Sequence, residues 1–513
     1  MKNIGLIIIV FIVIILNSCE NKKKEIKPPN IIVFLVDDMG WQDTSVPFWD
    51  KETPFNKQYH TPNMELLAKE GMKFTQAYAT PVCTPTRVSF ITGMNAARHR
   101  VTNWTSAKDK IHNMEKNHPT LEIPEWNMNG LSPVKGEPHA VYATALPQLL
   151  QQAGYYTVHV GKAHFGARGT IGANPLNIGF NVNIGGTGAG QPGSYLGTEN
   201  YGNGIKRLKP WAVPNLEEYY GKDIFLSEAL THKAIKAMDT AIADKKPFFL
   251  YMAHYALHTP IMADKRYLQK YLDKSLDTIE AKYATLIEGM DKSLGDIMDH
   301  LKSKNIDKNT IILFMSDNGG LSAIARGGKK HTHNKPLSSG KGSMHEGGIR
   351  EPMIVKWPGR IKADTSTDQM VIIEDFYPTI LEMAGIKDYE IVQKIDGVSF
   401  IPVLKGEVLK DHNRPLFWHY PNEWGPSGPG IGASSTVRKG YWKLIYYHNN
   451  ESFELFNIYK DIGEQNNLVK SNPEKVKELA IILTDYLKSV KAQMPKHKKT
   501  GKVVSYPINT LEK

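Results

Sequence analysis

The feature that most limits the fold is a series of short apolar runs separated by helical patterns. The runs cover residues 30–36, 156–161, 247–253, 310–315 and 352–357. Their continuous apolar character is typical of strands that are buried on both faces of a parallel sheet. Helical patterns lie between them, at residues 61–71, 145–153, 226–243 and 279–302. This alternation predicts an α/β fold with a mostly parallel sheet that helices flank on both faces.

Polar side chains follow four of these runs directly, at the point where each predicted strand ends. They are Asp37 and Asp38, Lys162, His254 and His258, and Asp317 and Asn318. In open α/β sheets the functional site lies at the carboxyl ends of the strands. We therefore expect these residues to converge, although they are far apart in the sequence.

The acidic pair among these residues points to a bound cation. Asp37 and Asp38 are adjacent, and burying two carboxylates together is costly unless a cation lies between them. Asp317 and Asn318 add another carboxylate and a carbonyl oxygen. A turn or a helix cap would explain either pair alone, whereas both at strand ends favour a metal site. All-oxygen ligands of this kind suit Ca²⁺ better than zinc.

The pattern changes near residue 410. Short alternating segments at residues 415–420, 434–439, 442–447 and 452–456 precede a helical pattern at residues 473–491. They predict a small α+β subdomain with an antiparallel sheet over residues 410–490, after a catalytic domain over residues 30–409. Residues 491–513 are predicted to form a basic tail. The segment 103–138 carries little regular pattern and is a candidate lining of the site.

The N-terminus carries an export signal. The apolar run at residues 4–16 is shorter than the about 20 residues that a spanning helix needs, and it fits a signal-peptide core. The sequence LNSC at residues 16–19 resembles a bacterial lipobox, which implies a signal peptide over residues 1–18 and a lipid on Cys19. Residues 19–29 then read as a tether. We expect an exported lipoprotein on the outer membrane, facing the periplasm or the cell surface; the alternative is an ordinary secretory signal.

Cysteine content and charge narrow the function further. The chain has two cysteines, so a lipid on Cys19 leaves Cys83 without a disulfide partner. A free thiol in an exported protein needs an explanation, and catalytic chemistry is one. The formal net charge of +11 fits either a solvated surface or attraction of an anionic substrate. No nucleic-acid-binding motif accompanies this charge, so we expect no nucleic-acid partner.

The strongest motif is CTPTR at residues 83–87, which resembles the signature C-x-P-x-R of the sulfatases. Pro85 suits a first helical turn, and a helix N-terminus there would face an anion. The resemblance implies that a maturing enzyme oxidises Cys83 to formylglycine (3-oxoalanine). Its hydrated form is then the nucleophile that attacks sulfur. Arg87 would contact the sulfate, orient the formylglycine and the metal, or do both.

Three further segments resemble sulfatase motifs. Residues 154–166 keep the Lys162 and His164 of the second signature, although Ala163 and Phe165 replace its Trp and Leu. The resemblance implies that Lys162 binds sulfate and that His164 orients the nucleophile.

In residues 247–260 the His before x-Pro maps to His258, beside the leaving group, with His254 as its competitor. A histidine there would protonate the leaving oxygen. Residues 339–352 resemble G-K-G-x-x-x-E-G-G-x-R and imply that Lys341 binds sulfate, with Lys335 as the alternative.

Taken in order, these motifs identify the chain as similar to the type I formylglycine-dependent sulfatases of the alkaline-phosphatase superfamily, over residues 29–468. The resemblance implies an alkaline-phosphatase-like sheet and sulfate ester hydrolysis. It also implies one Ca²⁺, held by Asp37, Asp38, Asp317, Asn318 and the modified Cys83.

The alternatives are a phosphodiesterase or phosphonate monoester hydrolase of the same superfamily, and a non-catalytic glycan-binding lipoprotein. The all-oxygen ligand set argues against the first, and the intact CTPTR motif argues against the second.

Segments 103–138 and 439–468 resemble polysaccharide sulfatases of marine Bacteroidetes. This narrower resemblance implies a sulfated carbohydrate substrate, such as the algal polysaccharides ulvan or carrageenan. We expect about half of a set of polar and aromatic residues to contact it. The set is Arg98, His99, Trp104, His331, His333, His345 and Trp424.

Overall fold

The computed structural model describes residues 27–323, 326–409, 411 and 413–512. The predicted signal peptide, the lipobox with Cys19 and most of the tether lie outside these residues. None of the helices in the described ranges is long and apolar enough to cross a membrane.

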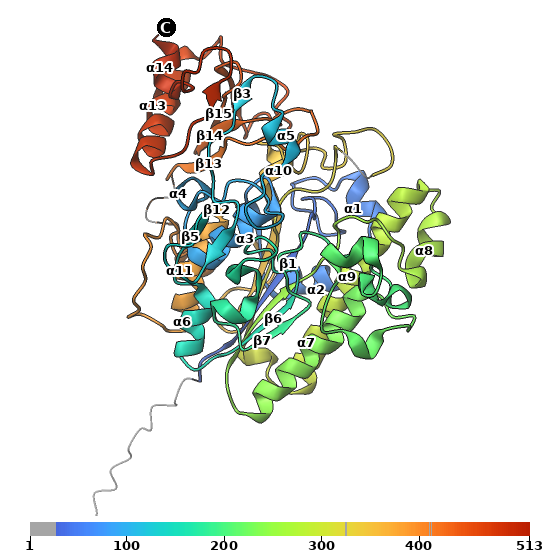
Figure 1. Cartoon of the computed structure of the whole chain (residues 1–513). Helices are drawn as coiled ribbons and strands as arrows, with labels where there is room; N and C mark the ends of the chain where they lie inside the picture. The colour runs from blue at the N-terminus through green and yellow to red at the C-terminus, as the bar shows by residue number, and fades with distance from the viewer. Residues whose placement is uncertain (1–26, 324–325, 410, 412, 513) are drawn as a thin grey trace, which may run out of the picture.

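A large sheet forms the centre of the molecule (Figure 1). In spatial order its strands are β11 (Thr365–Thr367), β2 (Met72–Tyr78), β10 (Arg350–Lys356), β9 (Thr310–Ser316), β1 (Asn30–Val36), β8 (Phe248–Ala253), β6 (Tyr156–Gly161) and β7 (Val182–Ile184). The five strands β9, β1, β8, β6 and β7 run parallel to one another, and β12 (Val371–Ile372) pairs in parallel with β2. The mostly parallel sheet is confirmed. β10 departs from the expectation, because it runs antiparallel to both β9 and β2.

Helices cover both faces of the sheet, which explains why its central strands are apolar throughout. The odd-numbered residues of β1 from Ile31 to Leu35 pack in one hydrophobic core, and the even-numbered residues from Ile32 to Val36 pack in another. The helices of the first core are α3 (Cys83–Thr92), α6 (Leu146–Gln152), α11 (Phe376–Met383) and α12 (Ile401–Leu404). Those of the second core are α2 (Pro62–Glu70), α7 (Leu226–Ala243), α8 (Lys265–Leu272) and α9 (Thr278–Ser303).

An antiparallel sheet forms a second layer at the C-terminal end, seen at the top of Figure 1. Its strands are β13 (Leu416–Tyr420), β14 (Ser434–Lys439), β15 (Trp442–Tyr447) and β16 (Ser452–Asn457), and α13 (Pro473–Ser489) packs on them. The predicted α+β character of this region is confirmed. Trp418 shares the first hydrophobic core with α3, so the core continues from one sheet to the other. The domain boundary at residue 410 therefore stays a prediction.

The segment predicted as a basic tail is folded onto this layer. β17 (Lys496–His497) pairs with β3 (Leu121–Glu122), and α14 (Pro507–Leu511) packs against α13. The remaining short elements are α1 (Pro54–Gln58), α4 (Ala96–His99), α5 (Asn113–Lys116), β4 (Gly130–Ser132), β5 (Ala140–Tyr142) and α10 (Glu346–Ile349).

Candidate active site

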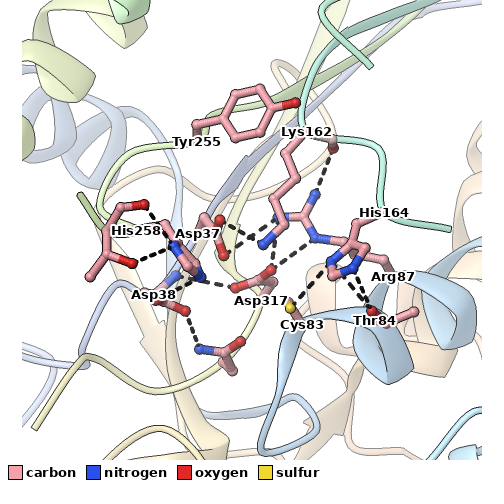
Figure 2. A network of polar contacts seen from close by, with 12 residues as sticks. Asp37, Asp38, Cys83, Thr84, Arg87, Lys162, His164, Tyr255, His258 and Asp317 are labelled. Atoms are coloured by element: carbon pink, nitrogen blue, oxygen red, sulfur yellow. Dashed lines mark hydrogen bonds and ion pairs between the residues drawn. The ribbon is translucent and has the colours of Figure 1, made fainter. Parts of the chain in front are cut away.

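The carboxyl ends of β1, β6, β8 and β9 lie side by side, and the polar residues that follow them converge there (Figure 2). Asp37 and Asp38 follow β1, and Asp317 follows β9. All three are fully buried. The backbone joins these strand ends, because the Asp38 amide donates to Asp317 Oδ1 over 3.2 Å. The predicted convergence of these residues is observed.

Three oxygens in this cluster accept no hydrogen bond from any described residue: Asp37 Oδ1, Asp38 Oδ2 and Asn318 Oδ1. Buried polar atoms are rarely left in this state, because an unpaired one keeps its desolvation cost. A hard cation bound by these oxygens would satisfy all three. The chemistry of the donor set therefore fits a divalent ion such as Ca²⁺. One possible ligand atom each from Asp37, Asp38 and His258 also lie within 4.8 Å of one another.

Two lysines pair with the acidic cluster. Lys162 Nζ donates to Asp37 Oδ2 over 2.7 Å, and Lys341 Nζ donates to Asp38 Oδ1 over 2.6 Å. Burial raises the pKa of Asp37 well above its usual value, in spite of Lys162. Burial acts in the same sense on Asp38, but Lys341, His258 and Lys162 outweigh it and lower its pKa. The cluster therefore consists of buried carboxylates and lysines in direct contact, and the pKa of each carboxylate depends on the charges beside it.

Arg87 lies within this charge cluster and is fully buried. Its Nε and Nη2 approach Asp317 Oδ2 to 2.9 and 2.7 Å, and its Nη1 donates to the Lys162 carbonyl over 2.7 Å. Burial lowers the pKa of Arg87, but the carboxylates of Asp317 and Asp37 help to outweigh it, and the pKa is raised. These contacts hold Arg87 against Asp317 and the Lys162 segment, and its contact with sulfate and its orientation of the formylglycine and the metal both stay predictions.

Cys83 is the first residue of α3 and is 3% exposed. The helix has no side-chain cap at Val82, so its first amides are open to an anion. Sγ of Cys83 lies 3.4 Å from His164 Nδ1, as Figure 2 shows. Burial raises the pKa of the Cys83 thiol, although Lys162 and Lys341 oppose this effect.

The contacts of His164 define its tautomer. Nε2 lies 2.9 Å from the Thr105 carbonyl, which can only accept, so Nε2 carries the proton. Burial, with Lys162 next in effect, lowers the pKa of His164 well below its usual value, so the ring is neutral. Nδ1 is therefore an acceptor, and it lies 3.4 Å from Cys83 Sγ and 3.3 Å from Thr84 Oγ1. This arrangement can take a proton from a nucleophile at residue 83.

The two candidate histidines after β8 occupy different environments. His254 is fully buried, with Nε2 2.9 Å from Ser293 Oγ on α9. His258 has Nδ1 3.0 Å from the Thr259 carbonyl and Nε2 3.8 Å from Asp38 Oδ2. Burial and Lys341 lower the pKa of His258 to about 3. The geometry therefore agrees with the choice of His258.

A cavity of about 410 Å³ opens beside these residues. Of the predicted catalytic residues that the structure describes, those in its lining are Cys83, His164, His258 and Lys341. Arg87 and Lys162 are instead held against the carboxylates. Sequence reasoning missed Arg168, Gln191 and Trp211, which also line the cavity. Arg168 lies two residues after the end of the motif at residues 154–166, and that proximity could have marked it, whereas no pattern marks Trp211.

Of the seven predicted sugar-contacting residues, Trp104 and Trp424 belong to the described lining of the cavity. The expectation that about half of the seven contact substrate stays a prediction. Arg98 is bound to Asp396, with Nη2 2.7 Å from Oδ1. The four remaining histidines lie outside this lining. They are His99, His331, His333 and His345. His99 contacts Ser89 Oγ, and His333 Nε2 contacts the Gly327 carbonyl. His345 contacts Ser338 Oγ and Glu454.

Comparison with known proteins agrees with this site. Residues 29–386 match the family model described as Sulfatase, and residues 339–493 match the one described as N-sulphoglucosamine sulphohydrolase, C-terminal. A sulfatase of Formosa agariphila is 30% identical, over 93% of this chain and 91% of the relative. The N-acetylgalactosamine-6-sulfatase of Mus musculus is 32% identical, over 77% of this chain and 69% of its own length.

A solved structure has the same fold over nearly the whole chain. Ps i-CgsB in complex with k-i-k-neocarrahexaose is 28% identical, with a TM-score of 0.70, over 90% of this chain and 93% of that one. The family match covers well over half of the chain, and the fold and the cavity with its CTPTR cysteine agree with it. The chain belongs to the sulfatase family, as the motifs predicted, and is a sulfuric ester hydrolase.

Proposed function

We propose that the protein hydrolyses sulfate esters of a sulfated polysaccharide, or of its oligosaccharides, with carrageenan as the first candidate. It does so with a formylglycine made from Cys83 and with one bound Ca²⁺. The observation that carries the proposal is a single cavity whose lining holds Cys83, His164, His258 and Lys341. This cavity adjoins buried carboxylates with unsatisfied oxygens.

The metal ligands in this proposal are Asp37, Asp38, Asp317 and Asn318, together with the modified residue 83. Bound Ca²⁺ supplies positive charge where a sulfate ester and the nucleophile meet. The orphaned oxygens of Asp37, Asp38 and Asn318 support this set, because nothing else described in the chain satisfies them.

The formylglycine supplies the attacking hydroxyl when it is present. His164 is placed to take the proton from that hydroxyl, because its Nδ1 is unprotonated and faces residue 83. The Thr105 carbonyl fixes the ring, so the acceptor nitrogen keeps this direction. A positioned base of this kind contributes about 10²–10⁴-fold to a rate.

Lys341 stabilises the charge of the sulfate group. It lines the cavity, and it is fixed there by its 2.6 Å contact with Asp38. Lys162 adds positive potential from its place beside Asp37. Fixed cations in a buried site stabilise charge that moves among the sulfate oxygens, at no cost of reorganisation.

His258 serves the leaving group. Its low pKa of about 3 comes from burial and from the positive charge of Lys341. The negative charge of a bound sulfate ester would offset the effect of Lys341. Substrate binding would raise the pKa of His258, and a protonated ring could donate to the bridging oxygen. A sugar alkoxide is a poor leaving group and needs that proton.

The aromatic lining supports a carbohydrate substrate. Trp104, Trp211 and Trp424 line the cavity and offer flat apolar faces to sugar rings, while Arg168 and Gln191 offer polar contacts. The similarity to Ps i-CgsB, solved with a carrageenan oligosaccharide, supports carrageenan. The N-acetylgalactosamine-6-sulfatases among the relatives also point to sulfated sugars. Ulvan stays a prediction that rests on the marine resemblance.

The location in the cell is proposed from the sequence. LNSC at residues 16–19 supports a lipoprotein that is exported and held on the outer membrane by lipid on Cys19. On the cell surface such an anchor would bring the site to extracellular polysaccharide, and in the periplasm it would bring the site to imported oligosaccharides.

The function is tested with enzyme produced together with a formylglycine-generating enzyme, and with Cys83→Ala as the matched inactive control. Desalted carrageenan, ulvan, fucoidan and chondroitin sulfate oligosaccharides are incubated with each, and free sulfate is measured by ion chromatography. We expect release from carrageenan oligosaccharides by the wild type alone. Hydrolysis of aryl sulfates with every glycan untouched would overturn the substrate, and turnover confined to phosphodiesters would overturn the whole proposal.

A further inference from the structure

A second groove lies along the seam between the large sheet and the C-terminal sheet. Two cavities, of about 730 Å³ and about 420 Å³, share Gln76, Asp368 and Tyr441 in their linings and so form one continuous hollow. No described lining residue is common to this hollow and the cavity of Cys83. We call it the seam groove. Two adjoining cavities of this volume leave room for more than one unit of a chain-like ligand.

Both layers of the protein build the seam groove. The large sheet contributes residues 47–50 after β1 and side chains of β2 and β11. The C-terminal layer contributes the turn between β14 and β15 and residues 458–462 after β16. Strands of both sheets and the loops beside them therefore line the groove, which favours a preformed binding surface.

Exposed aromatic rings stand in this groove. Tyr441 is 55% exposed and Tyr459 is 76% exposed, and their ring centroids lie 4.9 Å apart. Trp49 and Trp442 also line it. Rings this exposed to water contribute little to the stability of the core. Exposed aromatic rings of this kind often mark a surface that a ligand covers. The C–H face of a sugar ring packs well on such a surface.

Cations outnumber anions in the lining. The cationic side chains are Lys73, Arg350, Arg438, Lys439, Lys460 and Lys475. The anionic ones are Asp50, Asp368 and Glu478. Lys439 and Lys475 both pair with Glu478, whereas Lys460 forms no ion pair within the part of the chain that the structure describes.

The two arginines share one carboxylate. Arg350 Nη1 and Arg438 Nη1 lie 3.3 and 3.0 Å from the same Glu346 Oε2. Lys443 Nζ takes the other oxygen at 3.0 Å. Burial lowers the pKa of Arg438 to about 9 and also lowers that of Arg350. Glu464 also pairs with Lys443, so three cations face two carboxylates, and the remaining positive charge beside the groove favours an anionic ligand.

Open aromatic rings, two adjoining cavities and excess positive charge together describe one kind of ligand. We propose that the seam groove binds the sulfated polysaccharide chain away from the cleaved ester, so that the enzyme stays on the polymer between turnovers. The inference rests on the proposed function, because the ligand is the substrate polymer of that site. Short substrates that fill the Cys83 cavity alone gain nothing from the groove.

Affinity electrophoresis in gels that contain κ-carrageenan polymer tests the proposal, with dextran as the uncharged control and dextran sulfate as a generic polyanion. The groove variants are Tyr441→Ala with Tyr459→Ala, and separately Lys460→Gln. The matched controls are Tyr142→Ala, at a tyrosine 40% exposed, and Lys405→Gln, both outside the groove. All are made in wild-type and Cys83→Ala backgrounds, so binding is read without turnover.

We expect the double tyrosine variant to weaken carrageenan binding about tenfold, or about 1.4 kcal/mol, because both exposed rings lose their contacts with the polymer. Lys460→Gln should weaken it less, and the control variants should not change it. In the background that keeps Cys83, turnover of a small aryl sulfate should be the same in the groove variants and the control variants.

Unchanged carrageenan binding in both groove variants would overturn the proposal, as would an equal loss in the control variants. An equal loss of dextran sulfate binding would make the groove a site for polyanions in general and would overturn recognition of the sugar. If the wild type released no sulfate from any glycan, the proposed function would be wrong. The binding measurements in the Cys83→Ala background would still test whether the seam groove binds the polymer.

Discussion

The carboxylate of Glu346 is expected to be a main link between the two sheets, and its replacement tests this reading. Glu346 belongs to the motif that supplies Lys341, yet it lies in a different set of contacts. Its side chain is fully buried and accepts from Tyr78, Arg350, Arg438 and Lys443. Tyr78 and Arg350 belong to the large sheet, and Arg438 and Lys443 belong to the C-terminal sheet.

Glu346→Gln keeps the volume of the side chain and removes its charge. Lys443 retains Glu464, 2.8 Å from its Nζ, but Arg350 and Arg438 lose the one carboxylate that they share. Removing one partner of a buried ion pair costs about 3–5 kcal/mol, because the other charge stays buried. We expect the free energy of unfolding to fall by an amount in that range.

Urea denaturation followed by tryptophan fluorescence measures this loss, and hydrogen exchange locates it. We expect protection to fall in β14 and β15 more than in β1, because the link joins the C-terminal layer to the rest. A loss below about 1 kcal/mol, of the size of an exposed ion pair, would refute the reasoning.

Glu351→Gln is the matched control, since Glu351 is equally buried and follows Glu346 by five residues. Neither of its oxygens has a hydrogen-bond partner in the described ranges, and burial raises its pKa well above the usual 4.5. The folded state therefore holds it neutral, and the amide should change stability by less than about 1 kcal/mol near that pH. As pH rises above about 4.5, the unfolded wild type ionises Glu351 and the native state loses stability, so the variant should become relatively more stable.

Four further predictions concern the site and the anchor. Cys83→Ala should abolish turnover and leave the melting temperature unchanged, and mass spectrometry of the tryptic peptide ending at Arg87 should find 3-oxoalanine in the active wild type; an unmodified Cys83 in fully active enzyme would contradict the mechanism. Removal of metal with a chelator should abolish activity, and Ca²⁺ should restore it where zinc does not; Asp317→Asn should raise the Ca²⁺ concentration that is needed. His258→Ala should lower kcat about 10²–10⁴-fold for sugar sulfates and far less for nitrophenyl sulfate, whose leaving group needs no proton; equal losses on both would argue against a proton donor. Cys19→Ala should release active enzyme from membranes into the soluble fraction, and retention of the variant on membranes would refute lipid anchoring.

Much of the fold follows from local pattern. Strands such as β1 and β9 are apolar on both faces because each face meets a separate core, and a continuous apolar run records this directly. β2 was not predicted, because its sequence MKFTQAY mixes polar and apolar residues near the edge of the sheet. The antiparallel direction of β10 could not be predicted either, because an apolar run in the sequence does not indicate which way its strand runs in the sheet.

The site divides in the same way. Asp37 with Asp38, and Asp317 with Asn318, were predictable because residues directly after parallel strands must gather at one edge of the sheet. The separate environments of His254 and His258 depend on how the chain turns after β8, and so does the contact of His254 with α9. Trp211 reaches the cavity from a segment without a regular pattern, so no spacing marked it.

By itself, the sequence determined the sulfatase family and the identity of most polar residues at the strand ends, and it predicts the chemistry at residue 83. Short motifs suffice for this, because a strand end and a helix start fix the positions of their own neighbours. The tertiary structure alone decided that Arg87 orients Asp317, that Glu346 joins the two sheets, and that a groove follows their seam. Each of these depends on contacts between residues far apart in the chain, and such contacts are set by the packing of whole layers.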